Sequence, residues 1–356
     1  MAAAEVVILK TDRELDEWCD ALAAFGSVAV DTEGDSLHCY FEKLCLIQIT
    51  IPGRNVLIDP LERMDFSRLN RVLHERTTVF HGCDYDLRML RRATGFIAGT
   101  IFDTYLAARI AGLREVGLAS LVKQFFGIDL PKSSQKANWA RRPLTPAMIA
   151  YAVNDTKHLL DLADQLGAML RGKGRWSWFE ETCQRAVAAA AEDRERDPER
   201  AWQISGSAVL RGQALAILRA LWHWREFEAQ QVDRPAFQIL RNDELVGIAK
   251  NATNTHFQIP SNLPSGRRKR FQSALQRALD LAESEWPQRV RSQRSRPTSE
   301  QEKCFEELKV RRDRIAAELE LDAGVIAPRQ ALERVARAPE SAHTVFMCWQ
   351  RKLLGL

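Results

Sequence analysis

Asp31 and Glu33 end a β-rich run, Val28 to Glu33, and their types and spacing could support chemistry. Alternate side chains of a strand point to the same face, so these two carboxylates should lie side by side while Thr32 points the other way. Adjacent carboxylates repel each other unless a cation lies between them, and oxygen ligands suit Mg²⁺ or Mn²⁺. Because acidic pairs at strand ends are common without a metal, this pair predicts a site only if other elements supply further carboxylates.

A second acidic segment lies at the junction of a predicted strand, 77–81, and a predicted helix, 84–94. We assign Asp84 as the residue that caps this helix, which is the usual role of Asp at such a junction. Asp86 then lies in the first turn, where the positive helix end favours its ionised form. From there it could reach across the strand ends toward the first acidic pair.

A third segment starts with Thr145 as a helix cap and Pro146 at the first helical position. Tyr151 and Asp155 follow four residues apart, so they share one helix face. A phenol and a carboxylate therefore face the same point. A buried Tyr and Asp pair can also satisfy each other within a core, and helix periodicity alone leaves both interpretations open.

The elements that must position these residues are strands first and helices afterwards. Thr11 and Glu14 form a capping-box pattern that predicts a short helix before the first strand. Further strands are expected at 44–51, 55–59 and 77–81, and short links between the first three strands predict an antiparallel meander. Helices are expected at 84–94, 102–111 and 118–126, each followed by a glycine. The pattern predicts an α/β domain with a mixed sheet.

The composition is that of a globular protein with more than one domain. Its 356 residues, 46% of them hydrophobic, allow two or three domains with their own cores. The seven cysteines form no C-x-x-C pair, which fits reduced thiols in a cytoplasmic protein. Segment 1–10 does not resemble a signal peptide, because Glu5 interrupts its short apolar part. No run approaches the ~18 apolar residues of a membrane span, so we expect no membrane partner.

The positive charge belongs to the C-terminal part of the chain. Residues 1–190 contain 23 basic and 24 acidic residues, whereas residues 191–356 contain 28 and 23. Between 261 and 297 there are nine basic residues against three acidic ones, including the run from Arg267 to Arg270. This distribution suggests a polyanion partner, although a solvated basic surface would give the same counts.

The second half of the chain reads as helical and repeated. A charged stretch at 192–200 indicates a domain junction, and helical spacing of apolar residues predicts a helix at 207–231. Residues 239–250 match residues 326–337 at an offset of 87, which implies two copies of one small helical module. We therefore expect domains at 1–190, 203–286 and 298–356.

Together, the three acidic segments resemble the motifs of the DEDD exonuclease superfamily, in its tyrosine subtype. The resemblance is carried by Asp31-Thr-Glu33, by Asp86 within 81–87, and by Tyr151 to Asp155. Linking segments resemble ribonuclease D in particular: Leu46-Ile-Gln48, Ile101 to Thr104, 132–139 and Arg142-Pro-Leu144. The two helical modules resemble the helicase-and-ribonuclease-D C-terminal (HRDC) domain, the second less closely. One departure is that Gly34, Asp35 and Ser36 stand where ribonuclease D often has Phe and a basic residue.

The resemblance implies a ribonuclease-H-like exonuclease domain followed by two small all-α modules. It implies two divalent ions, Mg²⁺ or Mn²⁺. Asp31 would bridge them, Glu33 and Asp155 would hold the water-activating ion, and Asp86 would hold the other. Tyr151 would hydrogen-bond the attacking water, since a phenol of pKa about 10 is a poor base at neutral pH.

The function expected from these motifs is 3′-to-5′ exonucleolytic trimming of structured RNAs such as transfer-RNA precursors. The partner would be RNA with a free 3′ end. Single-stranded DNA is an alternative substrate, because the four acids face a phosphate and not the sugar. A further alternative is an RNA-binding protein with a retired site, although every acid and the tyrosine are present. Candidate nucleic-acid contacts are Lys132, Gln135, Arg142, Arg267, Arg268, Lys269 and Arg270.

Overall fold

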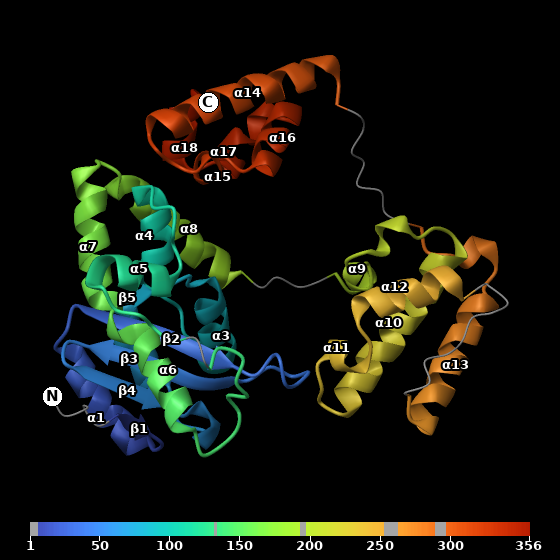
Figure 1. Cartoon of the computed structure of the whole chain (residues 1–356), viewed down its shortest axis with the longest axis horizontal. Coiled ribbons are helices and arrows are strands. Elements are labelled where there is room, and N and C mark those ends of the chain that lie inside the picture. Colours follow the sequence, from blue (N-terminus) through green and yellow to red (C-terminus); the bar gives the residue numbers. More distant parts are fainter. Residues whose placement is uncertain (1–5, 132–133, 193–196, 253–262, 289–296) are drawn as a thin grey trace. The chain divides into compact units, whose positions relative to one another are not determined.

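The computed structural model describes residues 6–131, 134–192, 197–252, 263–288 and 297–356 (Figure 1). By their contacts, these residues form two compact units. Unit 1 comprises Met1–Gly34, Leu44–Asp193 and Ser295–Leu356, and unit 2 comprises Asp35–Lys43 and Arg194–Arg294. The three predicted domains stay a prediction, since the contacts group the last of them with the first. Among the described residues, every helix is too short or too polar to span a bilayer.

Unit 1 is built on a six-stranded mixed sheet in the order β1-β4-β3-β2-β5-β6. The strands are β1 (Val7–Leu9), β2 (Ser27–Gly34), β3 (Leu44–Ile51), β4 (Arg54–Ile58), β5 (Thr77–Phe80) and β6 (Thr100–Asp103). The pairs β2–β3 and β3–β4 are antiparallel, which confirms the predicted meander. β5 and β6 add parallel strands beside β2, and β1 pairs in parallel with β4. β2 therefore lies inside the sheet with a strand on each side.

Helices cover the sheet and connect its parallel strands. They are α1 (Asp12–Ala23), α2 (Ser67–His74), α3 (Asp84–Thr94), α4 (Thr104–Ala111), α5 (Leu118–Phe126), α6 (Pro146–Lys157), α7 (Leu159–Gly172) and α8 (Trp176–Ala191). In Figure 1, α6 crosses one face of the sheet over β2, β3 and β4. Its residues Met148 and Ala152 pack with Leu46, Leu57 and Trp139 in a small core. Most of the other apolar side chains of the sheet belong to a larger, separate core.

The predicted helix at 102–111 was wrong at its start. Residues 100–103 form β6, and α4 begins only at Thr104 because the carboxylate of Asp103 caps it. Asp103 accepts hydrogen bonds from the N–H groups of Tyr105 and Leu106, at 2.8 and 3.2 Å. It also accepts from the N–H groups of Gly82 and Cys83, at 3.0 and 2.8 Å. One buried carboxylate thus fixes both the start of α4 and the turn that leads into α3.

Unit 2 contains the first helical module. Its longer helices are α10 (Gln213–Gln231), α12 (Asn242–Asn251) and α13 (Ser265–Leu279), with the short α9 (Pro198–Ala201) and α11 (Ala236–Ile239). The predicted helix at 207–231 is shorter than expected, because residues 207–209 form a separate 3₁₀ turn before Gly212. Segment 35–43 belongs to this unit, where the N–H groups of Tyr40 and Phe41 donate to Asp233, each at 3.0 Å.

The second helical module belongs to unit 1. It consists of α14 (Ser299–Glu318), α15 (Ala323–Ile326), α16 (Arg329–Arg337), α17 (Ala342–Val345) and α18 (Cys348–Leu354). The pair α15–α16 repeats α11–α12 at an offset of 87 residues, which is the repeat that the sequence predicted. The rings of Trp349 and Trp178 stack at 4.9 Å, and Glu181 accepts from the N–H groups of Cys348 and Trp349. This module therefore packs on α8.

Asp103→Asn tests whether the carboxylate holds the junctions of α3 and α4. The change should lower the free energy of unfolding by about 2 kcal/mol, because an amide NH₂ would face the N–H of Cys83 or a neighbouring donor. Chemical denaturation measures the loss. Asp65→Asn is the control, since Asp65 accepts from Ser67 at the surface. Equal losses in the two variants would contradict this role.

Candidate metal centre

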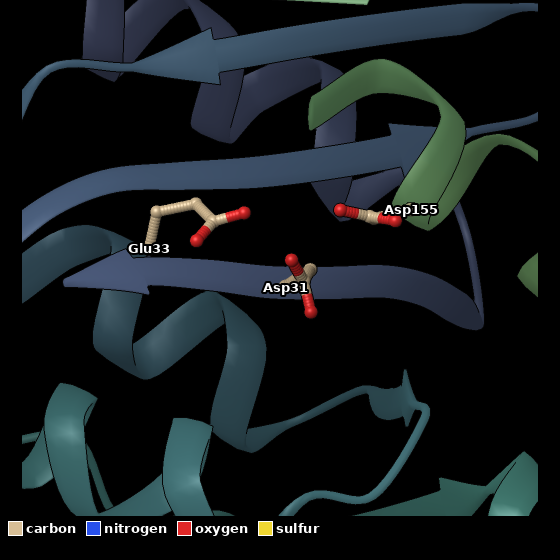
Figure 2. Close-up of side chains that lie close together, drawn as sticks. All are labelled: Asp31, Glu33 and Asp155. Carbon is tan, nitrogen blue, oxygen red and sulfur yellow. The ribbon is translucent and has the colours of Figure 1, made fainter. Parts of the chain in front are cut away.

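Three acidic side chains from two elements converge on one face of the sheet. Asp31 and Glu33 project from β2, and Asp155 approaches them from α6 (Figure 2). One carboxylate oxygen of each lies within 4.8 Å of the other two, which is close enough for a single ion to contact all three. Each residue also keeps part of its surface exposed, so solvent can reach the cluster.

The position of Asp155 follows from how α6 is anchored. Thr145 caps the helix, accepting from the N–H of Met148 at 3.3 Å. Met148, Ala152 and Thr156 are its buried residues and define the side that faces the sheet. The Thr156 hydroxyl lies 2.7 Å from that of Thr50 on β3, which fixes the end of the helix beside the cluster.

Asp86 lies outside this three-residue group but within electrostatic range of it. It is 5% exposed and accepts a hydrogen bond of 2.6 Å from the hydroxyl of Thr32. Thr32 sits between Asp31 and Glu33 on β2 and points to the other face, as its place in the strand predicted. Its role in holding Asp86 was missed, because that contact joins residues 54 positions apart.

The assignment of Asp84 as the helix cap was wrong. The residue at the cap position is Cys83, whose side chain makes no capping hydrogen bond, and Asp84 is the first residue of α3. Asp84 instead accepts from the guanidinium of Arg88 at 3.1 Å. The carboxylate of Asp103 takes over the capping region by accepting from the N–H of Cys83. Asp86 is in the first turn, as predicted.

Burial raises the pKa of every acid in the centre, and the charge of at least one other carboxylate adds to the rise in each case. The pKa of Asp31 lies well above its ordinary value, first because of desolvation and then because of Asp86, Asp155 and Glu33. Desolvation, with the charges of Asp155 and Asp86, raises the pKa of Glu33 to about 9. Desolvation is also the largest cause that raises the pKa of Asp86 and of Asp155 to about 7.

The donor set fits hard divalent cations. All four side chains offer oxygen atoms, and of the residues that the structure describes no Lys or Arg is among the groups that shift their pKa values. Ionising this cluster without a counter-charge is costly, and a bound Mg²⁺ or Mn²⁺ would remove the cost. Asp31, Glu33 and Asp155 could hold one ion, and Asp31 and Asp86 are the acids available to a second.

Tyr151 lies at the edge of this cluster. Its hydroxyl forms a hydrogen bond with Asp155, and its ring centroid lies 6.0 Å from that of Trp139. Burial, followed by the charges of Asp155, Glu33 and Asp31, raises its pKa above the ordinary value, so the phenol stays protonated at neutral pH. Tyr151 therefore lies within electrostatic range of three metal-centre acids, and a role beyond its hydrogen bond with Asp155 stays a prediction.

The candidate nucleic-acid contacts of unit 1 differ in their surroundings. Lys132 lies outside the described residues, and Gln135 is exposed. Arg142 is engaged within the protein: its guanidinium donates to both carboxylate oxygens of the buried Asp59 and to the carbonyl oxygens of Cys45 and Trp139. The structure therefore does not support Arg142 as a phosphate contact, because its donors are already used.

The basic run of unit 2 is also partly engaged. The guanidinium groups of Arg267 and Arg270 both donate to Glu228, a carboxylate on α10 whose side chain is 2% exposed. These bonds hold α13 against α10, and they lower the pKa of Glu228. Lys269 is exposed, and Arg268 is partly buried.

Two family models match the chain. One is described as 3′-5′ exonuclease and matches residues 6–171, and the other is described as HRDC domain and matches residues 214–256. A ribonuclease D of Nitrobacter hamburgensis is 30% identical, over 98% of this chain and 93% of its own length. A ribonuclease D of Pseudomonas paraeruginosa is 33% identical, over 70% of this chain and 67% of its own length.

Solved structures resemble the whole chain. Escherichia coli RNase D, described as an exoribonuclease involved in structured RNA processing, is 25% identical with a TM-score of 0.71. The match covers 94% of this chain and 90% of that one. A protein from Bifidobacterium adolescentis is 23% identical with a TM-score of 0.81, over 98% and 94% of the two chains, and shares the fold.

Glu33→Gln tests the electrostatic strain in the centre. Glu33 has a pKa of about 9 in the folded protein and about 4.5 in an unfolded chain, so the folded state binds the extra proton between these pH values. The free energy of unfolding of the wild type should therefore fall as the pH rises from 4.5 to 9. Gln cannot ionise. In EDTA, the melting temperature of the variant relative to wild type should therefore increase from pH 5 to pH 8. Glu62→Gln, at an exposed site, should show no such trend. A difference in melting temperature between Glu33→Gln and wild type that does not change with pH would contradict electrostatic repulsion at Glu33.

Proposed function

Because the chain belongs to the ribonuclease D family, and so is a 3′-to-5′ exoribonuclease, we propose that it trims structured RNAs such as transfer-RNA precursors with two divalent ions. The observation that carries this proposal is the convergence of Asp31, Glu33 and Asp155 within 4.8 Å. Asp86, held by Thr32, supplies the fourth acid. The same four residues and Tyr151 carry the motifs that the sequence shares with the family.

The acids divide into a close group of three, Asp31, Glu33 and Asp155, and Asp86 outside it. Glu33 and Asp155 would hold the first ion with Asp31, while Asp86 would share the second ion with Asp31. When bound, such a pair of ions neutralises charge on the scissile phosphate, lowers the pKa of the attacking water and stabilises the leaving 3′-oxygen. The contribution of the chain is to hold four carboxylates close together, although they repel one another when no cation is bound.

Tyr151 has the position and protonation state of an orienting group. Its hydroxyl is a donor to Asp155, and its raised pKa keeps the proton in place at neutral pH. A protonated phenol cannot take a proton from water, but it can fix the direction of a water molecule next to Asp155. We therefore assign it the positioning of the nucleophile and not its deprotonation.

The reaction assay compares 5′-labelled RNA and DNA of one sequence with Mg²⁺, Mn²⁺ or EDTA. Our proposal predicts a ladder of products shortened from the 3′ end, faster on RNA, and no reaction in EDTA. A faster reaction on DNA would favour a DNA exonuclease. No reaction with either metal would favour a retired site, and cleavage inside the strand would contradict exonucleolytic attack.

Tyr151→Phe removes one hydroxyl and keeps the ring that packs near Trp139. The turnover number should fall roughly 10²-fold, with the KM nearly unchanged, because only the orientation of water is lost. Single-turnover kinetics on a short RNA measures the effect. A wild-type rate in Tyr151→Phe would mean that Tyr151 serves packing alone.

The first helical module offers a surface for capturing RNA. Between α10 and α13 lies a groove of about 490 Å³ whose lining includes Arg219, His223, Phe227, Arg270 and Arg277. None of the described residues that line it is acidic, and Phe227 is 47% exposed. Basic side chains beside an exposed aromatic ring suit single-stranded nucleic acid, which offers phosphates and base faces. We propose this groove as the capture site, with Arg219 and Arg277 as its phosphate contacts, since Arg270 also lines it but already donates to Glu228.

Arg219→Gln combined with Arg277→Gln tests the groove in the full-length chain. Truncation after α8 is a poorer test, because it would uncover Trp178, against which Trp349 stacks. The double variant should bind single-stranded RNA more weakly. The slope of log affinity against log salt should also become shallower by about 1.4, at about 0.7 for each phosphate contact. Fluorescence anisotropy across a salt series measures both.

The matched control is Arg234→Gln with Arg241→Gln, which removes two exposed charges from the same module outside the groove. Wild-type affinity and slope are expected for this control. If both double variants changed binding equally, the attraction would be a property of net charge and the groove would not be the capture site.

A further inference from the structure

Gln48 is a polar residue that the reaction proposed above does not use. It lies in the middle of β3 and is fully buried. Within the described part of the chain, neither its amide nitrogen nor its amide oxygen has a hydrogen-bond partner. Buried polar atoms are nearly always paired, because removing them from water without a partner is costly. A residue that carries two unpaired atoms at full burial therefore requires an explanation.

The register of the sheet places Gln48 beside the metal centre. Its Cα is paired with that of Asp31 on β2, and residues paired across antiparallel strands have side chains on the same face. Thr50, two residues further along β3, shares that face and contacts Thr156, the neighbour of Asp155 in α6. Gln48 therefore lies under α6, next to Asp31 and on the side from which Asp155 approaches.

The surroundings of Gln48 do not require an amide for packing. On its other side, its register partner is Leu57, and Leu46 lies two residues away on the same strand. Both are apolar and almost fully buried in the core under α6. Met or Leu at position 48 would fill similar space without leaving two polar atoms unpaired.

We propose that Gln48 is a positioning residue of the metal centre, whose amide N–H donates to the carboxylate of Asp31 when the site is loaded. The inference rests on the proposed function, since it concerns the state in which Asp31 is ionised and shared between cations. Gln is suited to this task because its amide donates without adding charge. Lys or Arg would compete with the cations, and Glu would add to the repulsion.

Gln48→Met separates this role from packing. In EDTA the melting temperature of the variant should equal or exceed that of wild type, because two unpaired buried atoms are removed. Its affinity for Mn²⁺, measured by isothermal titration calorimetry, should fall 10-fold to 100-fold, as expected for loss of a group that orients a ligand. Cleavage should recover part of its rate at high Mn²⁺ concentration.

Ile49→Val is the matched control. Ile49 is the next residue of the same strand, equally buried, and belongs to the core of the opposite face. This variant should lose thermal stability and keep wild-type affinity for Mn²⁺. Wild-type affinity in Gln48→Met, with or without a lower melting temperature, would overturn the proposal and leave Gln48 as a packing residue. Failure of the wild-type protein to bind Mn²⁺ would instead contradict the proposed function itself.

A measurement on the wild-type chain covers the case in which Gln48→Met does not fold. In protein labelled with ¹⁵N-glutamine, the side-chain NH₂ signals of Gln48 can be identified by their absence from Gln48→Met or, failing that, from Gln48→Glu. These signals should shift, and their hydrogen exchange should slow, when Mg²⁺ is added to the metal-free protein. Signals that Mg²⁺ leaves unchanged would overturn the proposal.

Discussion

The repulsion among the carboxylates gathered at the metal centre is the constraint on which the rest of unit 1 depends. Burial raises the pKa of Asp31, Glu33, Asp86 and Asp155, and the charge of Asp86 raises the pKa of the other three further. Among the described residues, no Lys or Arg is one of the groups that shift these pKa values. The fold must therefore hold these acids together at a cost in stability. β2 does so from inside the sheet, with a strand paired on either side. A cation bound among these carboxylates would relieve their repulsion, so the same arrangement favours cation binding.

Hydrogen bonds that involve no basic side chain maintain this geometry. The Thr32 hydroxyl holds Asp86 directly, the contact between Thr50 and Thr156 fixes α6, and Asp103 fixes the turn that leads into α3. None of these groups adds a positive charge that would compete with a metal. Function thus follows from a scaffold that positions charge without neutralising it, and the 3′-to-5′ exonuclease family to which the chain belongs depends on such a centre.

Local patterns predicted the parts of the site that local structure determines. The two-residue spacing of Asp31 and Glu33 placed both on one face of β2, and the cap at Thr145 placed Tyr151 and Asp155 on one face of α6. Contacts between distant residues could not be predicted in this way. Asp103, and not Asp84, accepts the hydrogen bond from the N–H of Cys83 at the start of α3. The guanidinium of Arg142 donates to Asp59. A basic residue in the sequence does not reveal whether an acid elsewhere in the chain already binds it.

The most direct test of the metal centre is anomalous diffraction from crystals of the full-length protein soaked in Mn²⁺. Our account predicts one Mn²⁺ peak in contact with Asp31, Glu33 and Asp155, and a second in contact with Asp31 and Asp86. Both peaks should be absent from crystals of Asp31→Asn treated in the same way. Mn²⁺ bound only at other positions would contradict this account. Full RNA-trimming activity without Mn²⁺ or Mg²⁺ at these carboxylates would contradict it as well.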